Sequence, residues 1–124
     1  MSDFSQRRHA FFAASLSFTL ALSASGPAAQ AASDDIAEGE RTFHVHCVHC
    51  HGPDGVGAMG PNLTDEATLH GDEFEDILNT VTNGVEGKPM RSWKNTLSAE
   101  RLAPVAKFVY SLKGTRIDGR LKAQ

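Results

Sequence analysis

The sequence contains few of the residues and patterns on which disulfide frameworks, β-sheets and nucleic-acid binding depend. Its 124 residues include only two cysteines, one tryptophan and one tyrosine. No stretch alternates apolar and polar residues as a half-buried strand does, and no internal repeat is present. The formal net charge of −3 provides no basic surplus for nucleic acid. The length favours one domain, and the apolar periodicity favours an all-helical one.

Residues 1–31 have the composition of a cleavable export signal. A basic pair precedes an uncharged run at residues 11–24, and a small-residue cleavage sequence ends at Ala31. A membrane anchor is the alternative, but the run is shorter than the ~18–20 residues that a span requires. We therefore expect a cleaved signal peptide, a folded domain over 32–113 and a loose basic tail over 114–124. The location implied is the periplasm, without stable membrane insertion.

Both cysteines lie in the segment "CVHCHGPDG", as Cys47 and Cys50, with His51 directly after them. A disulfide between them would close a very small loop and constrain little of the unfolded chain. A thioredoxin-like pair needs a preceding strand, and zinc usually needs four ligands, whereas the chain has no second cysteine pair. The remaining interpretation is C-x-x-C-H, the attachment sequence of a c-type haem. Each thiol then bonds one haem vinyl group, and the imidazole reaches the iron.

Three segments carry helical periodicity, and two loops rich in glycine and proline separate them. We expect helices over 34–47, 72–83 and 98–113. The first is capped by Asp34 or Asp35, the second by Asp72 and the third by Ser98.

The segment "GERTFHVHCVHCHGPDGVG" resembles the start of a class I cytochrome c, and "GPNLTD" and "PMRSWKNTLSAERLAPVAKFVYSLKG" resemble the rest of such a domain. The similarity runs from about residue 36 to residue 113, with a particular likeness to the single-haem domains of cbb3-oxidase subunits and small periplasmic cytochromes. It implies a class I cytochrome c fold, all-α, in which three main helices and two Gly/Pro-rich loops surround one covalently bound haem c.

The resemblance also implies a methionine as the second axial ligand of the iron. Met90 follows His51 by 39 residues, beyond a complete helix, so the chain is long enough to pass round the haem edge. Met59 follows it by only eight residues and suits the role of an apolar filler. We therefore expect Met90 to bind the iron, whereas His70 in its place would give a bis-histidine haem of low potential. Arg91 follows the methionine where the family often has proline.

Three more residues take cofactor-binding roles by the same resemblance. The carbonyl of Pro61 accepts a hydrogen bond from the ring of His51, which fixes the tautomer. Leu63 packs on a face of the haem. The indole of Trp93 lies near a haem propionate and donates its N–H to it.

Two residues do not suit the helix interiors in which they are expected. Gly39 costs about 1 kcal/mol relative to alanine, and the resemblance explains it by placing Gly39 and Phe43 where the first helix crosses the last helix at Phe108. Pro104 either kinks the last helix or moves its start to near Ala103.

Lys88, Arg91 and Lys94 surround Met90 in the sequence. We expect them to dock an acidic patch of a redox partner, with a merely solvated rim as the alternative. The function expected is that of a monomeric one-electron carrier between a donor dehydrogenase or complex and an acceptor such as a terminal oxidase, not an enzyme. Two alternatives remain: an open sixth site that makes the protein a gas or peroxide sensor or weak peroxidase, and a dedicated haem subunit of a larger oxidoreductase.

Overall fold

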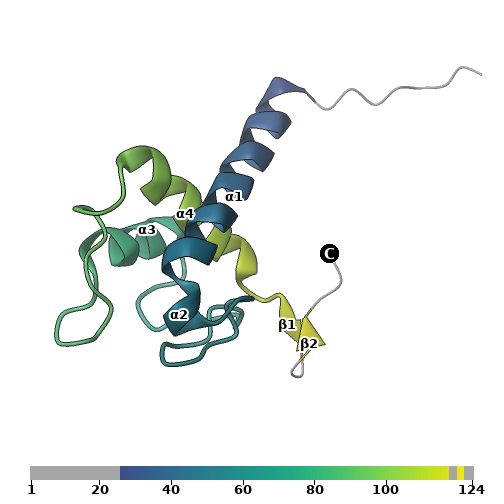
Figure 1. Cartoon of the computed structure of the whole chain (residues 1–124). Helices are drawn as coiled ribbons and strands as arrows, with labels where there is room; N and C mark the ends of the chain where they lie inside the picture. Colours follow the sequence, from purple (N-terminus) through teal and green to yellow (C-terminus); the bar gives the residue numbers. More distant parts are fainter. Residues whose placement is uncertain (1–25, 118–119, 122–124) are drawn as a thin grey trace, which may run out of the picture.

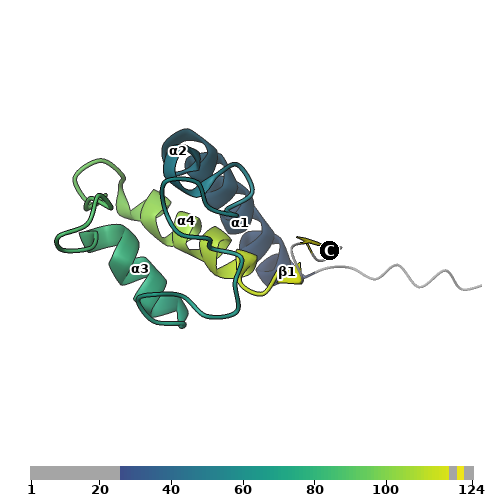
Figure 2. The same cartoon turned by 90° about the horizontal axis from the view of Figure 1, so that it is seen from below.

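The computed structural model describes residues 26–117 and 120–121. Its helices are α1 (Pro27–His46), α2 (Val48–His51), α3 (Phe74–Asn83) and α4 (Ala99–Leu112). Figure 1 shows the long α1 crossing α4, with α3 on the other side of α4. In Figure 2, seen from below, α4 lies between α1 and α3. The three longer helices and the two loops between them confirm the predicted architecture.

The first helix begins seven residues earlier than predicted, at Pro27. The expected cap at Asp34 or Asp35 is therefore wrong, because both residues lie inside α1. Asp35 instead forms an ion pair with Lys107 on α4. Proline is tolerated in the first turn of a helix and alanine is the best helix former, so the alanine-rich start extends α1.

The backbones of α1 and α4 touch at Gly39. A Cβ atom at this position would lie 2.0 Å from the carbonyl oxygen of Pro104 and 2.9 Å from Cβ of Phe108. One turn further along α1, the ring of Phe43 packs on Phe108 with 5.3 Å between the ring centroids. Only a residue without a side chain permits so close an approach. The predicted reason for an interior glycine is confirmed.

One apolar core joins α1, α3 and α4. Phe43, Val105 and Ala106 are 0% exposed, and Ile77 and Val81 face them from α3. Partly buried side chains pack on this core: Cys47, Val48, Leu63, Phe74, Leu78, Trp93 and Phe108. The core therefore extends from the helix crossing to the cysteine motif and to both loops.

The helix α3 begins after Glu73, not after Asp72. Glu73 and Asp76 form a capping box, in which each carboxylate accepts the backbone N–H of the other residue. Asp72 accepts the backbone N–H of Thr68 at 2.7 Å and pairs with Lys113 at 3.2 Å. The predicted cap at Asp72 is wrong because that carboxylate ties the preceding loop to the end of α4.

The helix α4 begins at Ala99, with Ser98 in the expected N-cap position, but the Ser98 side chain makes no capping hydrogen bond to the backbone of the helix. Pro104 lies inside the helix, so a start near Ala103 is wrong.

The basic tail contains a short backbone pairing where loose chain was expected. β1 (Arg116–Ile117) and β2 (Arg120–Leu121) run antiparallel, with Arg116 opposite Leu121. Two residues are too few for an alternating pattern, so the sequence gives no sign of these strands. Apart from this pairing, the regular structure of the described chain is helical. None of its described helices combines the length and the apolar character that a bilayer crossing requires.

Candidate functional site

Both cysteines and His51 lie where α1 turns into α2. The N–H of Cys47 donates to the carbonyl oxygen of Phe43 at 2.8 Å and closes α1. The N–H groups of Cys50 and His51 both donate to the carbonyl oxygen of Cys47, at 3.1 and 2.9 Å. One helical turn therefore presents two thiols and an imidazole, and both thiols are free of any disulfide.

Burial makes Cys47 a weak acid. Loss of water around its sulfur, with a smaller contribution from the neighbouring Cys50, raises the pKa of Cys47 to about 11. The thiol is therefore protonated at neutral pH. Zinc binding and thiol–disulfide exchange both use the thiolate, so this environment disfavours those two alternatives.

The loop after α2 orients the ring of His51. Nδ1 of His51 lies 3.0 Å from the carbonyl oxygen of Pro61, and because a carbonyl only accepts, Nδ1–H is the donor. The loop is drawn back by hydrogen bonds from the N–H of Gly57 to the carbonyl of His51 (2.8 Å) and from the N–H of Gly60 to the carbonyl of Cys50 (2.7 Å). The expected contact is present, and Nε2 is left with a free lone pair.

The loop after α3 folds back on that helix and fixes the backbone of Met90. Gly84, with a φ of 74°, turns the chain at the end of α3. The N–H of Val85 then donates to the carbonyl oxygen of Met90 at 2.9 Å. Met90 is half-buried, whereas Met59 is 71% exposed on the loop that follows His51.

Trp93 brings a buried donor to the same region. Within the described chain, its Nε1 is the one buried side-chain nitrogen or oxygen without a hydrogen-bond partner. The ring centroid lies 5.5 Å from that of His46, which precedes Cys47, and the guanidinium of Arg91 lies 4.5 Å from it. A buried N–H without an acceptor costs about 1–3 kcal/mol, so a bound group that carries an acceptor fits here. The role of Trp93 as donor to a propionate stays a prediction.

The remaining predicted site residues lie on the same two loops. Leu63 is half-buried against the core, and its N–H donates to the carbonyl of Gly55 at 2.7 Å. Lys88, Arg91 and Lys94 are exposed around Met90 in the chain. His49 and His70 are both exposed, so neither side chain belongs to the core. Sequence reasoning missed the neighbourhood of His46 and Trp93, because it depends on how the second loop returns to α1.

A family model decides the identity of this arrangement. Residues 34–109 match the model described as cytochrome c oxidase, cbb3-type, subunit III. The chain belongs to this family. Its members are electron-transfer haem proteins, so the cofactor of this cytochrome domain is haem c, bound covalently.

Individual relatives support the assignment. The cytochrome domain is 42% identical over 95 residues to the cbb3-type cytochrome c oxidase subunit CcoP of Rubrivivax gelatinosus, a match that covers 73% of this chain and 31% of that protein. It is 39% identical over 83 residues to subunit FixP of Bradyrhizobium diazoefficiens, covering 64% and 28%. The chain thus spans less than a third of the length of these relatives.

Solved structures of cytochrome cL share the fold of the domain. The protein from Methylophaga aminisulfidivorans aligns with a TM-score of 0.58 and 25% identity over 63% of this chain and 53% of its own. The protein from Hyphomicrobium denitrificans aligns with a TM-score of 0.57 and 20% identity over 68% and 58%, which supports the fold alone. The predicted class I cytochrome c fold is confirmed.

The residues of the site fit a covalent haem c. Cys47 and Cys50 are the only cysteines of the chain and stand one helical turn apart, so they would be the residues that hold the group covalently. His51 offers Nε2 to a metal, and the unpartnered N–H of Trp93 offers a donor. A bound haem c supplies a one-electron couple. The carbonyl of Pro61 orients the imidazole, and the loops that carry Pro61 and Trp93 would help to hold the group.

Proposed function

We propose that the domain is a one-electron carrier in which His51 and Met90 occupy the two axial positions of the iron and no substrate is transformed. The observation that carries the proposal is the hydrogen bond from Nδ1 of His51 to the carbonyl of Pro61. It fixes the tautomer in which Nε2 can bind a metal, and it makes the imidazole a more basic ligand. A methionine in the sixth position leaves no place for oxygen or peroxide, which favours electron transfer.

Burial and loop geometry support the choice of Met90 as the sixth ligand. Its backbone is tied to the end of α3 through Val85, and its side chain is half-buried. Met59 and His70 are both exposed. A neutral thioether favours ferrous iron and raises the reduction potential, as a respiratory electron carrier needs.

The optical spectrum of the purified haem-loaded protein tests this ligand set. Methionine ligation gives a weak far-red charge-transfer band in the ferric form and sharp low-spin bands on reduction. We expect Met90→Ala to abolish the far-red band and to lower the midpoint potential by part of the ~0.8 V range that axial ligands span. Met59→Ala is the matched control and should retain both properties.

The same spectra separate the alternatives. A far-red band that survives Met90→Ala and disappears in Met59→Ala would reverse the assignment. A high-spin ferric spectrum of the unmodified protein would favour an open site, and with it ligand sensing or weak peroxidase activity. A low-spin spectrum without the band would favour a second histidine.

We further propose that the carrier works in the periplasm after cleavage behind Ala31. Residues 26–34 are exposed, and the first buried residue of α1 is Gly39. Of the described residues, cleavage would therefore remove only the exposed 26–31. Mass spectrometry of the periplasmic fraction should find a chain that begins at Ala32, whereas a full-length chain in the membrane fraction would favour an anchor.

The exposed charges near Met90 support a docking role toward an acidic redox partner. Lys88 and Lys94 lie on the loop that carries the ligand, and such charges accelerate encounter at low ionic strength. Replacing both by glutamine should slow oxidation of the ferrous protein by ferricyanide, an anionic probe, at low salt. The difference should vanish at high salt. Equal rates at low salt would mean that these residues form only a solvated rim.

The relatives favour a second candidate, in which the domain is a haem subunit bound to a larger oxidase. Both relatives are named as subunits of cbb3-type cytochrome c oxidases. Affinity purification of the tagged protein from native membranes and soluble fractions distinguishes the two. A stable large complex would support the subunit, and a monomer in the soluble fraction would support the free carrier.

A further inference from the structure

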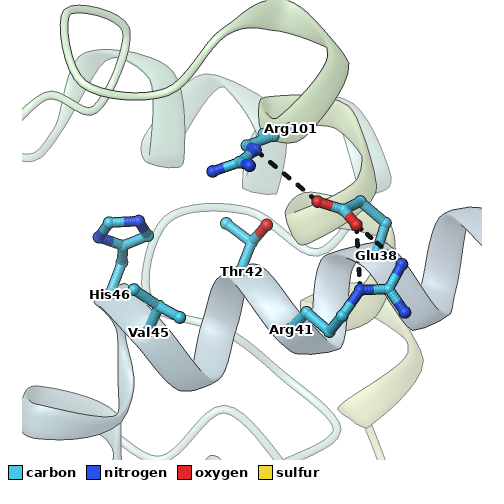
Figure 3. A pocket seen from close by; sticks show the side chains of 6 residues that line it. All are labelled: Glu38, Arg41, Thr42, Val45, His46 and Arg101. Atoms are coloured by element: carbon cyan, nitrogen blue, oxygen red, sulfur yellow. Dashed lines mark hydrogen bonds and ion pairs between the residues drawn. The ribbon is translucent and has the colours of Figure 1, made fainter.

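A pocket of ≈ 180 Å³, open to solvent, lies between the helices α1 and α4, and the proposed iron ligands do not line it. Its lining consists of Glu38, Arg41, Thr42, Val45, His46 and Arg101. All of them but Arg101 belong to α1, and Figure 3 shows Arg101 on α4 on the opposite side of the pocket. The pocket therefore exists only because the two helices cross, and apart from Val45 its lining residues are of polar or charged types.

Glu38 binds the two arginines of the pocket unequally. Oε2 of Glu38 accepts hydrogen bonds from Nε and Nη2 of Arg41 at 3.1 and 2.8 Å. Nε of Arg101 lies 3.7 Å from Oε1, which is too long for a hydrogen bond. The bond from Arg41 is the main reason why the pKa of Glu38 lies below its ordinary value, and Arg101 adds to it. Glu38 is thus ionised, and with two arginines the lining carries one net positive charge.

Arg101 has hydrogen-bond donors to spare. A guanidinium has five N–H donors, and among the described residues Glu38 is the only carboxylate paired with Arg101. The Arg101 side chain is 57% exposed. In Figure 3 its guanidinium extends above Thr42 toward the side of the pocket where His46 lies. A planar fork of donors over a small polar pocket suits one carboxylate, which it can bind in a bidentate manner.

Two ring contacts link the pocket to Trp93 and Arg91 on the loop after α3. The ring of His46 lines the pocket and packs against Trp93. The guanidinium of Arg91 lies over the same indole. Arg101 and Arg91 therefore stand at the two ends of one strip, with an imidazole and an indole between them. Two guanidiniums so arranged complement two carboxylates on one protein surface better than they complement a single small acid.

We propose that Arg101 binds a carboxylate side chain of an acidic redox partner in this pocket, that Arg91 binds a second carboxylate of the same partner, and that Glu38 competes with the partner for Arg101. This interaction deepens the proposed electron-carrier function and rests on it. Because Glu38 already lies beside Arg101, the pocket is held in its binding geometry at the cost of weaker binding. Such an arrangement suits a partner that must leave after one electron has passed.

The test is a titration of the haem-loaded protein with an acetylated peptide that carries two glutamates in a Gly/Ser segment, and with its glutamine twin. Binding is followed by NMR through the side-chain Nε–H signals of the arginines. We expect the glutamate peptide to shift the signals of Arg101 and Arg91, and the twin to shift neither. Arg101→Gln should weaken binding about threefold to fivefold, the range of an exposed ion pair. Glu38→Gln should strengthen it.

Lys107→Gln is the control, because it removes one positive charge from α4 outside the pocket. Equal affinities of the Arg101→Gln and Lys107→Gln variants would overturn the proposal, as would a Glu38→Gln variant that binds no more tightly. If acetate alone shifts the NMR signal of Arg101 as strongly as the peptide does, the ligand of the pocket is a small free acid and not a protein partner, and the proposal is wrong. The far-red band is recorded on the same samples, so a failure of the carrier function is seen separately from a failure of this pocket.

Discussion

Where α1 crosses α4, the backbones touch at Gly39 and the side chains of Phe43 and Val105 are 0% exposed. In the loops after α2 and α3, Leu63 and Met90 are only half-buried, and the backbone is held by its own hydrogen bonds. The helix crossing is packed by protein side chains alone. The second is a frame whose half-buried side chains and unpartnered indole N–H suit a large apolar group with polar ends.

This difference separates two sources of stability. The helix crossing is stabilised by tight packing, which depends on shape at the level of single atoms. The loops gain stability mainly when the cofactor adds its apolar surface to a core that is small for a chain of this length. Changes in the two regions should therefore affect different measurements.

The largest effect should follow when the cofactor is withheld. We expect the chain expressed without haem attachment to lose cooperative unfolding, because the loop side then lacks most of its apolar partner surface. Circular dichroism during urea titration measures this directly. A sharp transition and a well-dispersed NMR spectrum of the cofactor-free chain would refute it.

Thiol alkylation reports the same state of the cofactor-free chain at each cysteine. In the folded structure the pKa of Cys47 is raised to about 11, so iodoacetamide would react more slowly with Cys47 than with Cys50 near pH 8 only in a chain that kept this fold without the cofactor. Because this pKa is raised in the folded state, the free energy of unfolding should fall as the pH rises from the ordinary thiol range toward 11. Equal alkylation of both cysteines would agree with an unfolded chain, and a lag at Cys47 would indicate that its burial persists.

The next largest effect should come from Gly39→Ala in the haem-loaded protein. The added Cβ would lie 2.0 Å from the carbonyl oxygen of Pro104, so the helices must separate. We expect a loss of about 3 kcal/mol in the free energy of unfolding, at the upper end for an overpacked core. Gly87→Ala is the control, because nothing lies within 4 Å of its added Cβ and its φ of 69° brings only a local backbone cost. Equal stabilities of the two variants would mean that the crossing is not the tight contact described here.

The accuracy of the sequence-based predictions follows the same division. Features with local causes were predicted correctly, such as the cysteine motif on a helix end and the end of α3 at Asn83. The helix starts at Pro27 and after Glu73 were missed, because alanines near a cleavage signal resemble a leader and because an acidic capping box lacks the usual serine or threonine. The placement of Arg101 beside Glu38 could not be predicted from the sequence, since it depends on how α1 and α4 are aligned where they cross.

A smaller effect, seen in the redox potential, should follow from Gly60→Ala. The added Cβ would lie 3.1 Å from the carbonyl oxygen of Cys50 and 3.2 Å from Nδ1 of His51. The imidazole must then shift by a few tenths of an ångström, which weakens its bond to Pro61. We expect a changed midpoint potential with a stability loss of about 1 kcal/mol. Gly87→Ala is the control: its φ of 69° makes alanine unfavourable, but nothing lies within 4 Å, so stability should fall while the potential stays.

The smallest effect should come from Asp72→Asn, at the tie between the first loop and the end of α4. The N–H of Thr68, and secondly Lys113, hold the pKa of Asp72 below its ordinary value. An acid with a lowered pKa stabilises the fold above its unfolded pKa, and this contribution is lost as the pH falls through the lowered value. The variant should therefore lose some thermal stability at neutral pH but little in acid, where the parent has lost the same contribution.

Thermal unfolding of the haem-loaded protein at several pH values measures the effect of Asp72→Asn. Asp54→Asn provides an exposed carboxylate in the same loop as a control for net charge. Because Asp72 is exposed and screened, its effect should be smaller than that of Gly60→Ala. A drop as large as that of Gly39→Ala would mean that the loop is as tightly bound to the helices as the helices are to each other. The contrast between the two regions would then be lost.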